Sequence, residues 1–510
     1  AGCRRPDGSR NLKFPPRTHR LLWISSVSSV MFTASRSGSS EFPRGRIPML
    51  TIADSHHQLD RRGFLTLGTL GLGGLGLSSL LHAASERPDL VTGKSVIFLF
   101  QQGGPSQFET FDPKPDASSS VRTLTGTRTT SLPGVHFGDT LGQLADVAHK
   151  LVVVRSFQTE NAEHNIQPIV SKATMQANIG SLYSRVAGAI NPVSGIPTNA
   201  VLFPQAACND VTKGSARGDI AATGAFGAAF APFVPGAGGN LQRDMRLNLP
   251  RDRFEDRQTL HSALDKTRRD WDSQEQSRSV SKFQDQAYEL LLNGGAADAL
   301  DLSKESASVV ERYDTRQYAP SHNWAKSNRG KRGYYTGQAK SIGKLLLMAR
   351  RMCEAGCGFV TIHADYEGVW DMHADGENLN MVDGMDAIGR SFDHAVAAFI
   401  EDVEARGLSD KILLVCCGEM GRTPRINRNG GRDHWAKLAP LMLYGGGIRG
   451  GQVIGQSTRD GSEPETEPLT VPHLISTILH TVFDVSGLRL KPGLGQLARL
   501  SEHPVIPGLW

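Results

Sequence analysis

Two apolar runs, SVIFLF at 95–100 and ILLVCC at 412–417, constrain the fold of this chain more than any other sequence feature. A strand with one solvent face alternates apolar and polar residues, whereas a strand covered on both faces shows no such alternation. The runs therefore predict central strands of a doubly wound α/β fold, a mostly parallel sheet with helices on both faces. The other predicted core elements are strands at 151–154, 199–203, 359–363 and 441–444 and helices at 337–355, 386–405 and 472–485.

The segment 205–332 differs in composition, because it is rich in Gly, Ala and charged residues and holds an amphipathic run at 283–292. An amphipathic run is typical of a helix. We therefore expect a helical insertion within a single large domain that spans residues 85–510. Residues 1–48 lack an initiating methionine and any sustained period, so we interpret them as a non-native or disordered extension.

An export signal is predicted at 49–84. From Met49 the chain has a polar stretch, then the pair Arg61-Arg62, a Gly/Leu stretch at 64–81 and the small residues Ala83-Ala84. This order of features is typical of a twin-arginine signal peptide with a cleavage site.

The alternative for the stretch 64–81 is an uncleaved membrane anchor, since it is nearly long enough to span a bilayer. Its many glycines make it weakly hydrophobic, which favours a cleaved signal. We expect a periplasmic or cell-surface protein that meets the twin-arginine translocase during export. After cleavage we expect no stable membrane span.

The formal net charge of +5 could suggest nucleic-acid binding, but the excess of basic residues lies in the N-terminal segment. Residues 1–84 hold eleven Lys and Arg against four Asp and Glu, which leaves 45 basic and 47 acidic residues in the remainder. The mature chain is therefore not basic, and it has no interleaved aromatic and basic residues of the kind that bind nucleic acids. We expect no nucleic-acid partner.

Polar side chains that could carry chemistry follow the predicted strands. In open α/β sheets ligands bind beyond the carboxyl ends of the strands, so these loops are where a site is expected. The candidates are Gln102 and Ser106 after the first strand, Thr159 and His164 after the second, Asp371 and His373 after the strand at 359–363, and Glu419 and His434 after the strand at 412–417.

Carboxylates and imidazoles dominate the last two loops. Such groups, converging from neighbouring strand ends, form hard oxygen and nitrogen metal sites with open positions, as in hydrolytic zinc or manganese centres. Each residue alone has a simpler explanation: a turn cap for Asp371, hydrogen-bonded surface positions for the histidines, and an ion pair with Arg422 for Glu419. The combination favours a metal site.

Four motifs, taken together, are specific for one family. They are GGPSQFETFDPKP at 103–115, VWDMH at 369–373, GEMGRTPRIN at 418–427 and GRDHW at 431–435. In these motifs the chain resembles the twin-arginine-exported, sulfatase-like proteins of domain-of-unknown-function family 1501, which are abundant in planctomycetes. The resemblance implies an alkaline-phosphatase-like doubly wound sheet and a centre of one or two metal ions that cleaves phosphate or sulfate esters.

The resemblance also implies a set of metal ligands. Asp371, His373 and His434 resemble the ligands of a first divalent ion, which is zinc, manganese or calcium. Glu419 stands where a second ion would have its carboxylate. Gln102 stands where the superfamily usually supplies Asp, and this departure favours one ion over two.

The nucleophile implied by the resemblance lies after the second strand, which makes Thr159 the first candidate, with His164 nearby as a ligand or an acid. Ser106 is the alternative nucleophile. The chain contains no C/S-x-P-x-R motif, the sequence in which sulfatases convert Cys or Ser to formylglycine. We therefore expect a metal-dependent hydrolase of small-molecule or glycan esters that works without formylglycine. The alternative is a non-catalytic, metal-retaining binding or surface-interaction protein of the same fold.

The export signal can be tested by replacing Arg61 and Arg62 with lysine. Because the translocase recognises the arginine pair, we expect the double variant to accumulate as full-length precursor in the cytoplasm. Arg87→Lys, placed after the predicted cleavage site, is the matched control and should be exported normally. Immunoblots of cell fractions measure both, and normal export of the double variant would contradict the signal.

Overall fold

The computed structural model describes residues 90–236, 253, 295–320, 331–363 and 368–510. All of them belong to one unit that comprises Thr51–Trp510. The predicted export signal, the extension at 1–48 and the amphipathic run at 283–292 lie outside the described residues.

The core of this unit is a sheet that contains seven strands within the described ranges, in the order β12-β4-β11-β8-β1-β7-β6. The two apolar runs pair with each other at its centre, where β1 lies parallel to both β8 and β7. This confirms the predicted mostly parallel sheet. The strands are β1 (Ser95–Phe100), β4 (Val152–Val154), β6 (Asn199–Leu202), β7 (Phe359–Ile362), β8 (Ile412–Cys417), β11 (Leu441–Gly445) and β12 (Gln452–Ile454).

One strand of the sheet runs against the others. β11 is antiparallel to both of its neighbours, β8 and β4. Its first residue, Leu441, therefore lies opposite Cys417, the last residue of β8. The chain that enters β11 thus reaches the same sheet edge as the chain that leaves β8. The edge strand β12 was not among the predicted strands.

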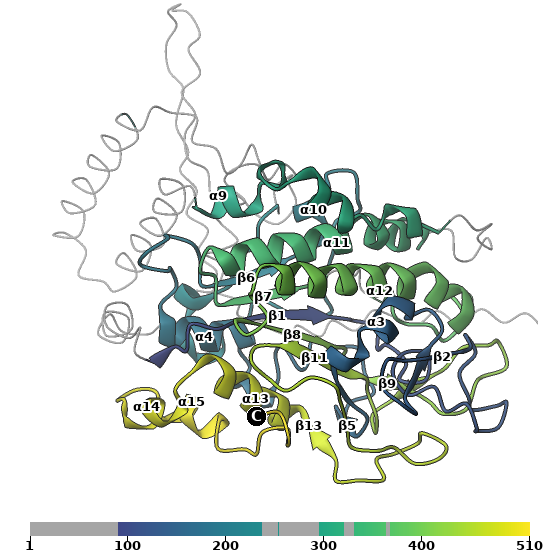
Figure 1. The fold of residues 1–510 in the computed structure, drawn as a ribbon. Helices are drawn as coiled ribbons and strands as arrows, with labels where there is room; N and C mark the ends of the chain where they lie inside the picture. The colour runs from purple at the N-terminus through teal and green to yellow at the C-terminus, as the bar shows by residue number, and fades with distance from the viewer. Residues whose placement is uncertain (1–89, 237–252, 254–294, 321–330, 364–367) are drawn as a thin grey trace, which may run out of the picture. The chain divides into compact units, whose positions relative to one another are not determined.

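Helices cover both faces of the sheet (Figure 1), as the uninterrupted apolar runs predict. Ile97 and Leu99 of β1 pack in the core beneath α11 (Arg332–Glu354) and α12 (Met381–Ala405). Val96, Phe98 and Phe100 point the other way, into the core beneath α4 (Ile179–Ala187) and α13 (Val471–Val482). All six residues of β1 are buried.

Helix α12 begins five residues before the predicted start at 386. The side chain of Asn380 accepts a hydrogen bond from the backbone N–H of Asp383, which satisfies one of the free N–H groups of the first turn. The apolar periodicity marks only the buried stripe of the helix, whereas this cap marks its true beginning.

The described part of the predicted insertion consists largely of short helices. They are α5 (Pro204–Ala207), α9 (Gly295–Leu300) and α10 (Ala307–Arg312), with 3₁₀ turns at Gly224–Phe226, Ala228–Phe230, Leu302–Lys304 and Arg316–Tyr318. Elsewhere the short helices are α3 (Gly142–Asp146), α14 (Val485–Leu490) and α15 (Gly495–Leu500), with 3₁₀ turns at Ala148–Lys150 and Lys172–Thr174. In the described part of the chain, three pairs of short strands lie outside the main sheet: β2 (Thr127–Thr129) with β3 (His136–Gly138), β5 (Phe157–Gln158) with β13 (Leu469–Thr470), and β9 (Gly421–Arg422) with β10 (His434–Trp435). None of the helices in the described ranges has the length and apolar character needed to cross a membrane.

A buried arginine joins the two long helices to the insertion. The Arg350 side chain on α11 is 1% exposed, and its guanidinium lies 2.6 Å from Glu305 and 3.0 Å from Asp402 on α12. It also pairs with Glu354, one turn further along α11. The Glu305 and Asp402 side chains are 9% and 3% exposed, so removal of Arg350 would leave these buried carboxylates with the less buried Arg351 and Arg406 as cationic partners.

We expect Arg350→Leu to lower the free energy of unfolding by about 3 kcal/mol, as loss of one partner of a buried ion pair does. Arg390→Leu is the matched control, because Arg390 pairs with Asp386 on the exposed side of α12, where both side chains are open to solvent. It should change the free energy by less than about 0.5 kcal/mol. Denaturant unfolding of both variants measures the difference, and equal shifts would show that the buried pairing adds nothing.

Candidate metal centre

The candidate residues come from four chain segments that meet at the carboxyl edge of the parallel strands. Gly103 follows β1, and Asp371 follows β7. Glu419 follows β8, and His434 lies in β10, on the path that returns into β11. His164 lies on the loop after β5. The antiparallel β11 therefore completes the site, because it brings His434 back to this edge.

Asp371 is the centre of the cluster and is 5% exposed. Its Oδ1 lies 2.7 Å from Nη2 of Arg422 and 3.3 Å from Nε2 of His434. Its Oδ2 lies 3.1 Å from Nε2 of His164 and 3.0 Å from Nε2 of His373. Three imidazoles and one guanidinium thus surround a single carboxylate.

Burial raises the pKa of Asp371, but the neighbouring imidazoles of His164, His373 and His434, together with the charge of Arg422, outweigh it and hold the pKa well below the usual range. Burial likewise lowers the pKa of His164, while the carboxylates of Asp371 and Glu419 raise it more. Asp371 is therefore an ionised carboxylate inside the protein, a state that requires close positive partners.

Two of the imidazoles have their Nδ1 protons fixed by acceptors. Nδ1 of His164 lies 2.8 Å from Oε1 of Glu419, and Nδ1 of His434 lies 2.9 Å from the carbonyl oxygen of Ala162. A carboxylate and a carbonyl can only accept, so each Nδ1 carries a proton. In the neutral state both rings then turn an Nε2 lone pair toward Asp371.

The donor set fits a divalent transition metal. One ligand atom from each of His164, Asp371 and His434 lies within 4.8 Å of the others. Nε2 of His164 is buried and makes no hydrogen bond, since its 3.1 Å approach to Asp371 lacks hydrogen-bond geometry. Two imidazoles and one carboxylate are the ligands of catalytic zinc sites, in which further positions stay open.

His373 lies at the open side of this cluster. Its Nε2 is also 3.0 Å from Nδ2 of Asn378, which in turn donates to Oδ2 of Asp371 at 3.3 Å. The side chains of His373 and His434 are 24% and 29% exposed, against 8% for His164. The side of His373 and His434 is therefore the more solvent-exposed side of the cluster.

Glu419 is close to the cluster but turned toward other partners. It is fully buried, and its two carboxylate oxygens accept from the backbone N–H of Gly103 at 2.8 and 3.0 Å, in addition to the bond from His164. Gln102 is likewise engaged: its Nε2 donates to the carbonyl of Asn165, and its Oε1 accepts from the backbone N–H of Arg217.

The two candidate nucleophiles differ in their surroundings. Thr159 is 4% exposed, and its Oγ1 makes only a long contact of 3.4 Å with the carbonyl of Asn161, on the loop that leads to His164. The Ser106 hydroxyl donates to Glu109, whose carboxylate forms a buried ion pair with Arg432. The hydroxyl of Ser106 is therefore part of a structural network.

Sequence reasoning missed the role of Arg422. This arginine is fully buried, and its guanidinium donates to the carbonyls of Gly103, Gly104 and Arg432 besides Asp371. The pairing of Arg422 with Glu419, considered from their spacing, is wrong, because Arg422 pairs with Asp371 instead. Its place in the GEMGRTPRIN motif was the available signal.

The family model described as "Protein of unknown function (DUF1501)" matches residues 93–506. The chain belongs to this family. The expected family is thereby confirmed, over a span that contains every candidate residue of the site. No curated protein matches the chain.

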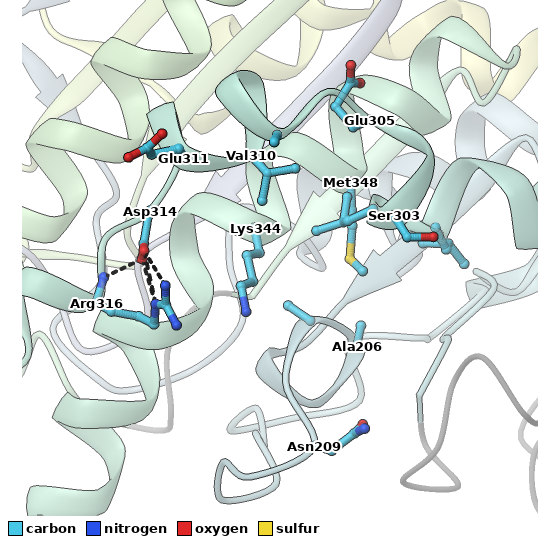
Figure 2. A pocket seen from close by; sticks show the side chains of 14 residues that line it. Ala206, Asn209, Ser303, Glu305, Val310, Glu311, Asp314, Arg316, Lys344 and Met348 are labelled. Atoms are coloured by element: carbon cyan, nitrogen blue, oxygen red, sulfur yellow. Dashed lines mark hydrogen bonds and ion pairs between the residues drawn. The ribbon is translucent and has the colours of Figure 1, made fainter.

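A cavity of about 780 Å³ lies elsewhere in the DUF1501 domain, between α5, α9, α10 and α11. Figure 2 shows Asp314 and Arg316 paired with each other in its lining, with Lys344 nearby. The Lys344 amine lies 3.7 Å from the sulfur of Cys208. No residue of this lining belongs to the cluster around Asp371.

We expect the folded protein to bind a divalent ion such as zinc through His164, Asp371 and His434. His164→Ala and His434→Ala should each raise the zinc dissociation constant by more than about 100-fold, because loss of a ligand exceeds loss of an outer hydrogen-bond partner. The fold should persist, since the apolar strands build the core.

Elemental analysis after dialysis, and competition with a chelating dye, measure this binding. His149→Ala, at an exposed histidine, is the control and should bind like the wild type. Wild-type metal content in the His164→Ala, His434→Ala double variant would show that the cluster holds no metal.

Proposed function

We propose that this protein is an exported, metal-dependent hydrolase of phosphate or sulfate esters, similar to the alkaline phosphatase and sulfatase superfamily. The observation that carries the proposal is the presentation of two Nε2 lone pairs, those of His164 and His434, to the buried carboxylate of Asp371. The mostly parallel sheet with this cluster at its carboxyl edge supports the same assignment.

A divalent ion held here would polarise an ester oxygen and lower the pKa of a hydroxyl nucleophile. The residues of the chain supply the remaining functions. Glu419 and the carbonyl of Ala162 orient the two imidazoles, and Arg422 holds Asp371 in place. The exposed edges of His373 and His434 leave room for a small-molecule or glycan ester.

Thr159 is the proposed nucleophile. Its hydroxyl is buried, belongs to the loop that carries His164, and has only one long contact. The absence of a C/S-x-P-x-R motif from the sequence favours a threonine or serine hydroxyl over formylglycine. Ser106 is the weaker candidate, because its hydroxyl is bonded to Glu109.

The second candidate function is a metal-retaining binding or surface-interaction protein. The side chain of Gln102 favours it, because an amide bonded to Asn165 and to the backbone of Arg217 replaces the carboxylate that a second metal ion would use. A single ion can still support hydrolysis, so this observation argues for one metal more strongly than against catalysis.

Hydrolysis of aryl phosphate and aryl sulfate esters by the metal-loaded protein tests the proposal. Asp371→Asn should abolish turnover, whereas Asp433→Asn, at an exposed carboxylate beside His434, should leave it unchanged. Thr159→Ala should lower kcat by at least about 1000-fold, as loss of a nucleophile does, and Thr159→Ser should retain much of the activity.

Metal-loaded wild-type protein that hydrolyses neither ester class, with several divalent ions and over a broad pH range, would contradict the hydrolase and support the binding protein. Equal activity of Thr159→Ala and wild type would leave the hydrolase intact but remove Thr159 as the nucleophile.

A further inference from the structure

The carboxylate of Glu419 is held in a fixed direction at the end of β8. The side chain is fully buried, and it follows Cys417, the last residue of the buried strand, by only two positions. The backbone N–H of Gly103 lies 2.8 Å from Oε1 and 3.0 Å from Oε2, so one donor spans both oxygens. Besides this N–H, the group in contact with Oε1 of Glu419 is the imidazole of His164.

The contact with His164 determines where the imidazole carries its proton. Nδ1 of His164 lies 2.8 Å from Oε1, and a carboxylate accepts but does not donate. The proton therefore stays on Nδ1, and the neutral ring keeps its lone pair on Nε2. That atom is buried, makes no hydrogen bond and lies 3.1 Å from Oδ2 of Asp371.

Glu419 itself is not placed to bind metal with these residues. Within the described ranges, the side chains whose ligand atoms gather within 4.8 Å are His164, Asp371 and His434, without Glu419. A carboxylate that orients a metal-binding histidine through its second nitrogen is a common device, and its loss weakens metal binding without removing a ligand.

We propose that Glu419 is a positioning residue: it fixes the Nδ1–H tautomer of His164 and so serves a single metal ion through that ring, instead of binding a second ion. This rests on the metal centre of the proposed function. The resemblance to two-metal enzymes implied a metal ligand at this position, and the contacts assign it a different role.

Glu419→Leu is the decisive substitution because it keeps the approximate size of the side chain and removes both acceptor oxygens. Glutamine would not serve, since its amide oxygen can take the position of Oε1 and still accept from both Gly103 and His164. In Glu419→Leu the Nδ1–H of His164 loses its acceptor, so the ring proton is free to move to Nε2. In that tautomer Nε2 has no lone pair for a metal.

The experiment compares wild type with Glu419→Leu, and with Glu163→Leu as the matched control at an exposed glutamate one residue before His164. The zinc content and the zinc dissociation constant are measured by elemental analysis and chelator competition. Long-range ¹H–¹⁵N spectra of the metal-free proteins, labelled on histidine nitrogen and recorded at alkaline pH, where the imidazoles are neutral, report the tautomer of His164. Thermal unfolding verifies that each variant is folded.

We expect one zinc per wild-type chain and a dissociation constant raised about 10–100-fold in Glu419→Leu, the range found when an orienting partner is lost. The His164 proton should be held on Nδ1 in the wild type and in Glu163→Leu, and should be found on Nε2 as well in Glu419→Leu. Glu419→Asp is the second variant. This variant keeps the negative charge but shortens the side chain. Weaker zinc binding by Glu419→Asp would therefore result from the lost contact with His164.

Two zinc ions per wild-type chain, one of which is lost in Glu419→Leu, would overturn the proposal in favour of a second metal site. An unchanged tautomer and an unchanged dissociation constant in both Glu419 variants would overturn it as well, as would a wild type without zinc. None of these measurements uses ester hydrolysis. An inactive wild type that binds one zinc would therefore contradict the proposed function alone.

Discussion

One buried negative charge, that of Asp371, organises the site. A carboxylate enclosed in protein is stable only when positive groups or donors compensate it. Arg422 supplies one full charge at 2.7 Å. The imidazoles of His164 and His434 have their Nδ1 protons committed to Glu419 and Ala162, so as neutral rings they face Asp371 with lone pairs. The carboxylate of Asp371 and the Nε2 lone pairs of the two histidines repel one another unless a proton or a cation lies between them. A divalent cation would bind all three groups.

Gly103 connects the two groups that orient this centre. Its N–H holds Glu419, which positions His164, and its carbonyl accepts from Arg422, which holds Asp371. The residue has a φ of +117°, and a Cβ atom there would lie 2.8 Å from the backbone nitrogens of Trp370 and Asp371. Only glycine allows this close approach. The turn after β1 is therefore part of the site through its backbone, although it contributes no side chain to the cluster.

The apolar runs of β1 and β8 predicted the centre of the sheet because complete burial leaves a plain compositional mark. The five residues of β11 carry no sequence feature that distinguishes an antiparallel strand from a parallel one, so its direction could not be predicted. The polar residues after the strands identified Asp371, His164 and His434 as candidates, but they did not show that His164, in place of His373, completes the cluster. The protonated nitrogen of each ring could not be predicted, because it depends on contacts between residues more than 250 positions apart. The position of Arg422 could not be predicted either, because arginines are rarely buried.

We propose that one divalent ion binds between His164, Asp371 and His434, with Glu419 outside its coordination shell. A crystal of the zinc-loaded protein, with anomalous data collected at the zinc edge, tests this arrangement. We expect one anomalous peak in this region, bonded to Nε2 of both histidines at about 2.0–2.1 Å and to a carboxylate oxygen of Asp371. The absence of a peak there, or a second peak bonded to Glu419, would contradict it.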